Sequence, residues 1–263
     1  FVEAADRLAP GLQSVGLVSG ALWTDADGDG LIDLLVACEW GPVSVWRNTG
    51  EGFENVTEGA GLAGLTGWWN SLVGADLDHD GDTDYIVTNA GLNTKYKASP
   101  EKPAYLYYGS FADGSPPQLV EAKVSSQAML PVRGLSCSSA AMPFIRDKLP
   151  TYHDFASATL TEIYEPAKLD QAVQLHATTL ESGVLLNRSG ETDSLRFDFV
   201  PLPRLAQASP GYGLAATDVD GDGDTDVYMV QNFFSREPET GRWDGGLSLL
   251  LLGDGSGSLT PVW

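Results

Sequence analysis

Short clusters of aspartate are the part of this sequence whose residue types and spacing could do chemistry. Three clusters run from Asp25 to Asp33, from Asp76 to Asp84 and from Asp218 to Asp226. Each has Asp at positions 1, 3, 5 and 9 and Gly at position 6, and together they hold 14 of the 36 acidic residues. Carboxylates packed this closely repel one another unless a cation lies among them. The spacing therefore predicts three metal-binding loops, one in each cluster.

Ca²⁺ is the cation that these loops suit best. A flexible loop of oxygen ligands matches Ca²⁺, whereas Mg²⁺ demands stricter geometry and keeps its waters. The position-6 glycine permits a sharp turn, and the position-7 carbonyl can add a ligand. The alternative, that the clusters are ordinary solvated turns, would not require the match at all four Asp positions. The predicted ligands are Asp25, Asp27, Asp29, Leu31, Asp33, Asp76, Asp78, Asp80, Asp82, Asp84, Asp218, Asp220, Asp222, Asp224 and Asp226.

The segments that flank the clusters predict strands rather than helices. An EF-hand loop ends in a glutamate ligand at position 12, but here that position holds Val36, Val87 or Met229. Short apolar runs follow each cluster, and alternating or apolar runs precede the first two. The clusters are therefore predicted to be the tips of strand–loop–strand hairpins.

Self-similarity beyond the loops predicts a repeated unit of four strands. The first and second clusters begin 51 residues apart, a plausible length for one four-stranded blade. Further pairs of strand-like runs follow at 183–187 with 197–200, which we assign to a third unit, and at 249–252 with 259–262. We therefore predict an all-β fold: a β-propeller of which about four units are visible, with residues 1–263 forming one propeller domain or a segment of one.

The third unit is expected to have lost its calcium loop. Aligned on the flanking strands, positions 1, 3, 5 and 9 become Ser110, Ala112, Gly114 and Gln118. Nearly all the charge is gone, so we predict that the loop Ser110–Gln118 binds no Ca²⁺.

Helical signals in residues 135–180 predict an insertion within this third unit. Thr151-Tyr-His-Asp154 resembles a capping box, and apolar residues follow at three- and four-residue spacing up to Tyr164. Glu165-Pro166 is expected to end this helix. A second short helix is predicted over residues 168–176.

The acidic hairpins, with the downstream segment Asn48-Thr-Gly-Glu-Gly-Phe53, resemble the FG-GAP/VCBS repeat family. The resemblance implies the calcium-carrying blades of integrin-α-like β-propellers, and the segments 47–50 and 53–57 look most like its secreted, ASPIC/UnbV-associated bacterial branch. It carries the calcium ligands over to the four Asp positions of each cluster, and none to Ser110–Gln118. Integrin-like propellers have seven blades, so the chain is expected to be part of a longer ring. The alternative is a smaller ring in which residues 1–5 complete the last blade.

Composition limits the function. The net charge of −21 repels nucleic-acid backbones and anionic lipid, and the longest apolar run, Leu249–Leu252, is too short to span a membrane. We expect a secreted, Ca²⁺-stabilised scaffold that binds a protein or a glycan. We expect it outside the cell, in the periplasm or at the cell surface, although the sequence contains no signal-type segment.

The alternative is a carbohydrate-active enzyme, a polysaccharide lyase or glycosidase. Its candidate residues all fall in the insertion, where a helix start and a solvated face would explain the same pattern: Tyr152, His153, Asp154, Glu162, Glu165, Arg146 and Lys148.

Other conspicuous residues have ordinary structural explanations. His79 is expected to be an exposed loop residue that points away from the ion, and His176 to lie at a helix end. Several tryptophans could be sugar platforms, but packing between blades is favoured; they are Trp23, Trp40, Trp46, Trp68 and Trp69. Cys38 and Cys137 could form one bridge or remain two thiols.

Overall fold

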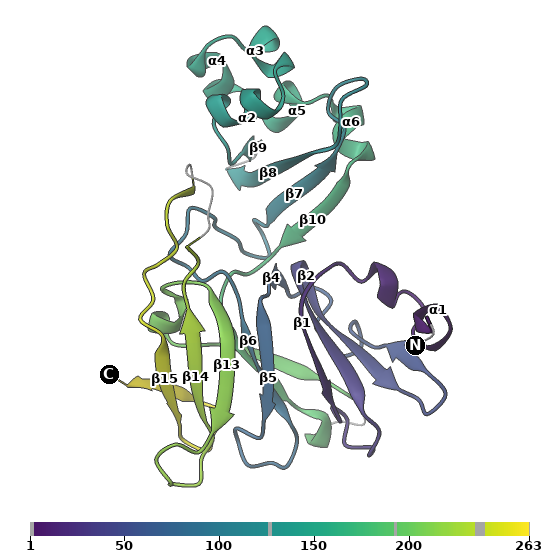
Figure 1. The fold of residues 1–263 in the computed structure, drawn as a ribbon, viewed down its shortest axis with the longest axis vertical. Coiled ribbons are helices and arrows are strands. Elements are labelled where there is room, and N and C mark those ends of the chain that lie inside the picture. Colours follow the sequence, from purple (N-terminus) through teal and green to yellow (C-terminus); the bar gives the residue numbers. More distant parts are fainter. Residues whose placement is uncertain (1–2, 126–127, 192–193, 235–239, 263) are drawn as a thin grey trace. The chain divides into compact units, whose positions relative to one another are not determined.

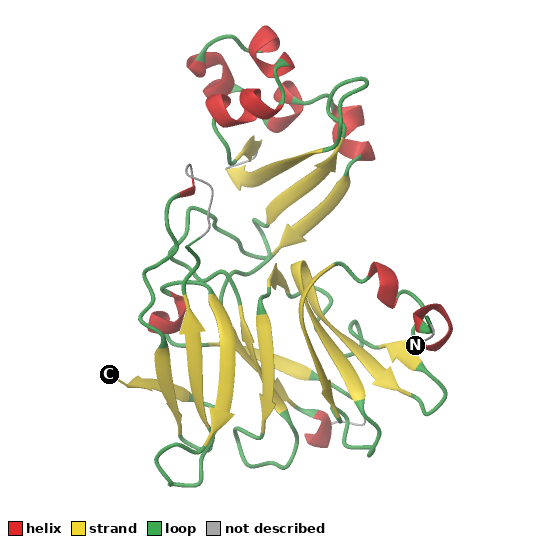
Figure 2. Cartoon of the chain, viewed as in Figure 1, coloured by secondary structure: helices red, strands yellow, loops and turns green. Residues whose placement is uncertain are grey.

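The computed structural model describes residues 3–125, 128–191, 194–234 and 240–262, and the chain divides into two compact units. Unit 1 combines Phe1–Lys95 with Thr179–Trp263, and unit 2 is Tyr96–Thr178. Strands dominate unit 1, and the α-helices of the middle of the chain lie in unit 2 (Figures 1 and 2). None of the described helices is long and apolar enough to cross a membrane.

Unit 1 consists of three antiparallel sheets of four strands each, as expected for propeller blades. The first blade contains β1 (Leu17–Thr24), β2 (Asp33–Asn48), β3 (Phe53–Asn55) and β4 (Thr66–Trp68). The second contains β5 (Ser71–Ala75), β6 (Asp84–Thr88), β11 (Gly183–Asn187) and β12 (Phe197–Pro201). The third contains β13 (Gly211–Thr217), β14 (Asp226–Gln231), β15 (Leu249–Gly253) and β16 (Leu259–Val262).

Strand β2 supplies two arms of the first blade. It has 16 residues, which would span roughly 50 Å if extended. Yet Asn48 N, at its end, donates a hydrogen bond to Asp33 Oδ1, at its start, over 2.7 Å. The strand must therefore double back, and Trp40 near its middle has the positive φ of 59° that such a turn uses. The predicted order of strand, loop, strand, turn and strand is confirmed in this blade.

The second blade corrects the sequence analysis. Residues 183–187 and 197–200 were expected in a third unit, but β11 pairs with β6 and β12 pairs with β11. They are the outer strands of the second blade, completed after the chain has formed unit 2. The strand pattern predicted both strands, but a short apolar strand carries no mark of the sheet that it will join.

The cores of unit 1 lie between neighbouring blades. Because side chains alternate along a strand, Tyr85 and Val87 of β6 pack with the first blade's Leu35 and Val45, in one cluster. Ile86, between them, packs in another cluster with strands of the third blade. The second blade is therefore apolar on both faces, which explains why β6 is buried at every position.

The N-terminal segment covers the other face of the first blade. Its described part contains α1 (Ala5–Leu8) and the 3₁₀ turn η1 (Leu12–Ser14), and it packs on Leu34, Val36 and Trp46. Residues 3–16 contain no strand, so the expected closing strand at residues 1–5 is not formed by its described part, and residues 1–2 lie outside the described residues. Two more 3₁₀ turns, η2 (Ser189–Glu191) and η3 (Arg204–Gln207), follow outer strands of the second blade.

Unit 2 combines a four-stranded sheet with five short helices. Its strands are β7 (Ala104–Gly109), β8 (Gln118–Ser125), β9 (Ala128–Pro131) and β10 (Val173–Ala177), in the order β10-β7-β8-β9. The helices are α2 (Leu135–Ala141), α3 (Phe144–Lys148), α4 (Tyr152–Ser157), α5 (Leu160–Ile163) and α6 (Pro166–Gln171). They pack on one sheet face through a common apolar core. In the sequence this unit interrupts the second blade, and it begins earlier than the helical insertion expected at 135–180.

The helices differ in detail from the prediction. The capping box from Thr151 to Asp154 is confirmed. The helix after it ends at Ala158, which is extended, and Pro166 begins α6 instead of ending a helix. Proline fits the first turn because its missing N–H has no partner there in any helix. The helix expected over 168–176 was wrong in its second half, since His176 lies in β10 and pairs with Tyr105.

Candidate metal centre

Each acidic loop joins the first two strands of a blade. The loops lie between β1 and β2, β5 and β6, and β13 and β14, and each ends on the first residue of the second strand. The glycines at position 6 have φ values of 87° at Gly30, 93° at Gly81 and 97° at Gly223. Only glycine adopts this left-handed conformation without strain, so the turn predicted from the sequence is present in all three loops.

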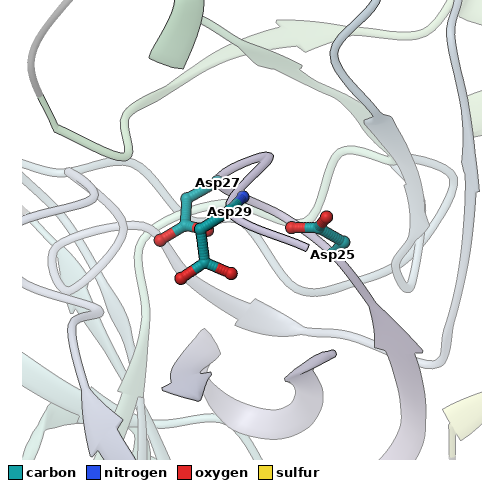
Figure 3. A group of neighbouring side chains, drawn as sticks. All are labelled: Asp25, Asp27 and Asp29. Atoms are coloured by element: carbon teal, nitrogen blue, oxygen red, sulfur yellow. The ribbon is translucent and has the colours of Figure 1, made fainter. Parts of the chain in front are cut away.

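The loops bring carboxylates together in three clusters, made of Asp25, Asp27 and Asp29, of Asp76, Asp78 and Asp84, and of Asp218, Asp220 and Asp226. Within each cluster one oxygen per residue lies within 4.8 Å of the others. In Figure 3, Asp25 approaches Asp27 and Asp29 from the other side of the first loop. Nine of the twelve position-1, -3, -5 and -9 aspartates are thus gathered, and Asp33, Asp80 and Asp222 lie outside the clusters.

Backbone amides hold the position-1 carboxylates inward. Asp25 Oδ2 accepts a hydrogen bond from Gly30 N over 2.9 Å, and Asp76 Oδ2 accepts one from Gly81 N over 3.2 Å. In the third loop Asp218 Oδ2 accepts from the position-6 amide over 3.1 Å. The turn glycine therefore orients one oxygen of each position-1 carboxylate and leaves the other oxygen for a different partner.

Carboxylate oxygens without a hydrogen-bond partner show whether the loops fit a cation. Asp25 Oδ1, Asp76 Oδ1 and Asp78 Oδ1 are buried atoms with no hydrogen-bond donor among the described residues. A buried carboxylate oxygen without a partner is costly, and here other carboxylate oxygens surround it. Converging oxygen ligands without N–H partners are the environment that Ca²⁺ prefers. The residues of the first two loops fit the ion.

The position-9 aspartates have a structural role that the sequence pattern did not reveal. Asp84 is fully buried, and it accepts from Leu77 N over 2.9 Å and from Asn187 N over 2.8 Å. Asp33 and Asp226 accept from the equivalent amides of their own blades. Each position-9 carboxylate therefore ties its loop to the third strand of its blade, whether or not it also contacts an ion.

Burial and mutual repulsion shift the pKa values of the loop carboxyls. Burial is the main cause that raises the pKa of Asp84 to about 6 and also raises that of Asp33, against the hydrogen bonds from backbone amides. At Asp220, desolvation followed by the charges of Asp222 and Asp226 raises the pKa. All of these shifts disfavour the charged carboxylate, and a cation in the loops would counteract them.

Position 7 and His79 link the loops to neighbouring segments. The side chain of Asp82 accepts from Gly190 N over 2.8 Å, in the same blade. The side chain of Asp224 lies 2.7 Å from His79 Nε2 of the second loop, and this hydrogen bond raises the pKa of His79. His79 is about half exposed, as expected from the sequence, and it also contacts the third loop.

The turn between β7 and β8 in unit 2 is built differently. Ser110 Oγ donates to Ala112 O and lies 3.1 Å from Ser115 Oγ, which in turn donates to Ala112 O. Phe111 is buried in the core of unit 2 and anchors the turn. Hydroxyls therefore satisfy this turn from within, and the expectation that it binds no Ca²⁺ stays a prediction.

The candidate catalytic residues of the insertion have structural partners. Asp154 and Glu162 cap α4 and α5 through Thr151 and Thr159. The exposed Tyr152 lies 2.9 Å from Ser136 Oγ, which with the nearby Arg146 lowers the pKa of its hydroxyl. Lys148 donates to a backbone carbonyl, that of Ile163. Among the described residues, His153 and Glu165 join no group of three ligand-type side chains with the capping carboxylates, and Arg146 lies over the Tyr152 ring, 5.7 Å from its centroid.

Most of the tryptophans pack inside unit 1. Trp40, Trp46 and Trp69 are buried, whereas Trp23 is exposed and tilted against Phe53. Trp68 lies between Trp40 and Trp243, with ring centroids at 5.2 and 5.6 Å. Packing between blades, favoured from the sequence, is confirmed for Trp69, whereas Trp46 packs with the N-terminal segment. Cys38 and Cys137 are both free thiols, and burial raises the pKa of Cys38 to about 11.

Comparison with known proteins finds one family over part of the chain. The model of the FG-GAP-like repeat matches residues 25–87, from the first acidic loop through the second loop into β6. No curated protein matches the chain. The matched segment has the repeat's hairpins and lies in a mostly β, four-stranded-sheet architecture. Residues 25–87 therefore match the FG-GAP-like repeat, which supports the family resemblance for this part of the chain.

Proposed function

We propose that this protein is a secreted, Ca²⁺-stabilised scaffold that binds a protein or glycan partner. The observation that carries the proposal is the pair of buried oxygens, Asp25 Oδ1 and Asp76 Oδ1, which have no donor and face other carboxylates. An ion in each acidic loop would satisfy these oxygens and offset part of the net charge of −21. Its binding free energy then adds to the stability of the blade that it closes.

The same Ca²⁺-binding chemistry supports the proposed location of the protein. Sites made of carboxylates and carbonyls in flexible loops bind Ca²⁺ well at millimolar concentration, as in extracellular modules. FG-GAP repeats are typical of extracellular proteins, which supports the extracellular, periplasmic or cell-surface location. The bacterial ASPIC/UnbV-associated branch stays a prediction.

Calorimetric titration with Ca²⁺ tests the metal part of the proposal. We expect three ions per chain, much weaker binding of Mg²⁺, and loss of one ion in Asp76→Asn. Asp170→Asn is the matched control, because it removes the same charge from an exposed residue of α6 outside the loops. A chain that binds no Ca²⁺, or that binds it equally well with the position-1 carboxylates of all three loops neutralised, would contradict the proposal.

The end of unit 1 opposite the acidic loops supports the binding part. Strand β6 begins at the second acidic loop and ends before Leu92, which is exposed and lines a cavity of about 550 Å³. Arg204, Leu205 and Ala208, which follow β12, line the same cavity. Its volume suits a small ligand or an anchoring side chain. Stability and recognition would thus be assigned to opposite ends of the blades.

A glycan and protein array, probed with the whole chain in Ca²⁺, tests for the partner. Leu92→Ala with Leu205→Ala should weaken binding, while Leu247→Ala, at an exposed residue outside the cavity lining, should leave it unchanged. Turnover of a bound glycan would instead favour the carbohydrate-active enzyme.

The seven-bladed ring is also a proposal, and the third blade supports it. By register, Tyr228, Leu250 and Leu252 correspond to Ile86, Val184 and Leu186, which pack on a neighbouring blade. Tyr228 is 48% exposed, so this blade presents an apolar face of the kind that another blade covers. The reading frame of the full gene tests this, because a longer ring requires more Asp-rich hairpins.

A further inference from the structure

Two of the acidic loops are joined to each other by side chains. His79 is at position 4 of the second loop, between Asp78 and Asp80, and its Nε2 lies 2.7 Å from Asp224 Oδ1. Asp224 is at position 7 of the third loop, 145 residues away in the sequence. The strands beside these loops, β5 and β13, are neighbours in unit 1. The His79–Asp224 bond therefore links loops of adjacent blades.

The turn between β15 and β16 packs on this link. Gly257 N donates to Leu77 O, in the second loop, over 2.9 Å. At Gly255, whose φ is 67°, an added Cβ would lie 2.7 Å from Asp224 Oδ1 and 3.0 Å from His79 Cδ2. The glycine thus lets the turn approach both side chains closely. A second contact therefore restrains the same two loops against each other.

The first loop has no counterpart to this link among its own side chains. Gly28 occupies position 4, where an added Cβ would meet nothing within 4 Å, and Leu31 occupies position 7. The first loop is linked to the second by Asn187, whose Nδ2 donates to Ala26 O over 2.8 Å and to Thr83 O over 3.1 Å. The second and third loops are therefore joined directly by their own side chains, whereas the first is joined to the second through backbone carbonyls.

We propose that His79 and Asp224 couple the second and third calcium sites, so that an ion in either loop favours an ion in the other. The inference rests on the proposed function. Neither side chain needs to touch an ion, because the position-7 ligand would be the carbonyl of Asp224 and His79 is flanked by ligands. An ion that orders one loop fixes its end of the bond, and the partner loop then loses less freedom when it binds. Such coupling is reciprocal by thermodynamic necessity.

Site-resolved titration of the whole chain tests the coupling. The amides of Gly30, Gly81 and Gly223 donate to the position-1 carboxylates, so their ¹H–¹⁵N signals report each loop separately. At one fixed pH, Asp76→Asn should disable the second site and weaken Ca²⁺ binding at the Gly223 reporter by about fivefold, within the usual range of coupling. Any change at the Gly30 reporter should be the same with and without His79, because the first loop makes no bond to it. In a His79→Ala background, Asp76→Asn should no longer affect Gly223.

Three further variants separate coupling between the loops from a general effect of charge. Asp224→Asn keeps an acceptor for His79 and should retain most of the coupling, whereas Asp224→Ala should remove it. Asp82→Ala deletes a position-7 carboxylate that bonds to Gly190 of its own blade, so the coupling should persist.

Two results would overturn the proposal, and they are distinguishable. If the wild-type reporters show no Ca²⁺ binding, the proposed function falls and the coupling falls with it. If all three loops bind Ca²⁺ but Asp76→Asn weakens the Gly223 site equally with and without His79, only the coupling is wrong.

Discussion

The first acidic loop of unit 1 and the Ser110–Gln118 turn of unit 2 both connect antiparallel strands, but they are held closed in opposite ways. In the acidic loop, Asp25 Oδ1 is buried without a donor and other carboxylates face it. In the turn, the hydroxyls of Ser110 and Ser115 bond to each other and to Ala112 O. One hairpin leaves a buried carboxylate oxygen that a cation would satisfy, whereas the other satisfies its polar groups with its own hydroxyls.

The comparison shows what the aspartates add. A tight turn between two strands is available to uncharged residues, so the acidic clusters are not required for turn formation. At position 9 they add bonds to the third strand of the blade, and under the proposed function the other positions add a dependence on Ca²⁺. Unit 1 would therefore be stable where Ca²⁺ is abundant, and unit 2 would not sense it.

Removal of Ca²⁺ should have the largest effect and should separate the two units. Saturation at about 100 times the dissociation constant adds about 2.7 kcal/mol per site. For three sites in unit 1, a chelator should lower the melting temperature by roughly 15–30 °C. Calorimetry or near-UV circular dichroism with and without EDTA measures this.

Unit 2 is the internal control for that experiment. Hydrogen exchange of its buried amides, such as those of β8, should be unchanged by EDTA, whereas amides of β6 should exchange faster. Equal loss of protection in both units would mean that the comparison between the acidic loops and the serine turn is mistaken.

Substitution within the second loop should separate structural from ion-dependent carboxylates. Asp84→Ala leaves the buried amides of Leu77 and Asn187 without acceptors, so it should lower the free energy of unfolding by about 3–5 kcal/mol with or without Ca²⁺. Asp76→Asn keeps an acceptor for Gly81 N but weakens the proposed ion site, so it should destabilise the protein only when Ca²⁺ is present. Denaturant unfolding in both conditions measures the difference, and identical behaviour of the two variants would contradict the assignment.

The sequence alone predicted the hairpins well because their signal is local. Asp at alternate positions, Gly at position 6 and an adjacent apolar strand constrain a short segment strongly, and the four-stranded sheets follow from their repetition. The capping box at Thr151 was predictable for the same reason.

Features that depend on distant partners could not be predicted. Residues 183–187 resemble any buried strand, and their pairing with β6 is decided across unit 2. His79 gave no sign of its partner 145 residues away. Position 9 matches the other aspartates in type, but only the fold reveals that Asp84 is buried against two amides.

A smaller effect is expected in the serine turn. Ser110→Ala removes the donor to Ala112 O, an internal bond that contributes about 1 kcal/mol. The loss should be the same in Ca²⁺ and in EDTA, because no ion takes part. Urea unfolding followed by the exchange of unit 2 amides measures it, and a cost that appears only in Ca²⁺ would show that this turn binds the ion after all.

The smallest effect should come from the one acid left in that turn. Asp113 pairs with Lys168, which lowers the pKa of Asp113, but its side chain is 95% exposed. Water and salt screen such pairs, so Asp113→Asn should leave the stability of unit 2 nearly unchanged, and Ca²⁺ should not alter the result. Asp29→Asn, at an exposed acid of the first loop, makes the same change of side chain and should reduce Ca²⁺ binding there. If Asp29→Asn, like Asp113→Asn, has the same effect with and without Ca²⁺, the two kinds of turn do not differ in their dependence on the ion.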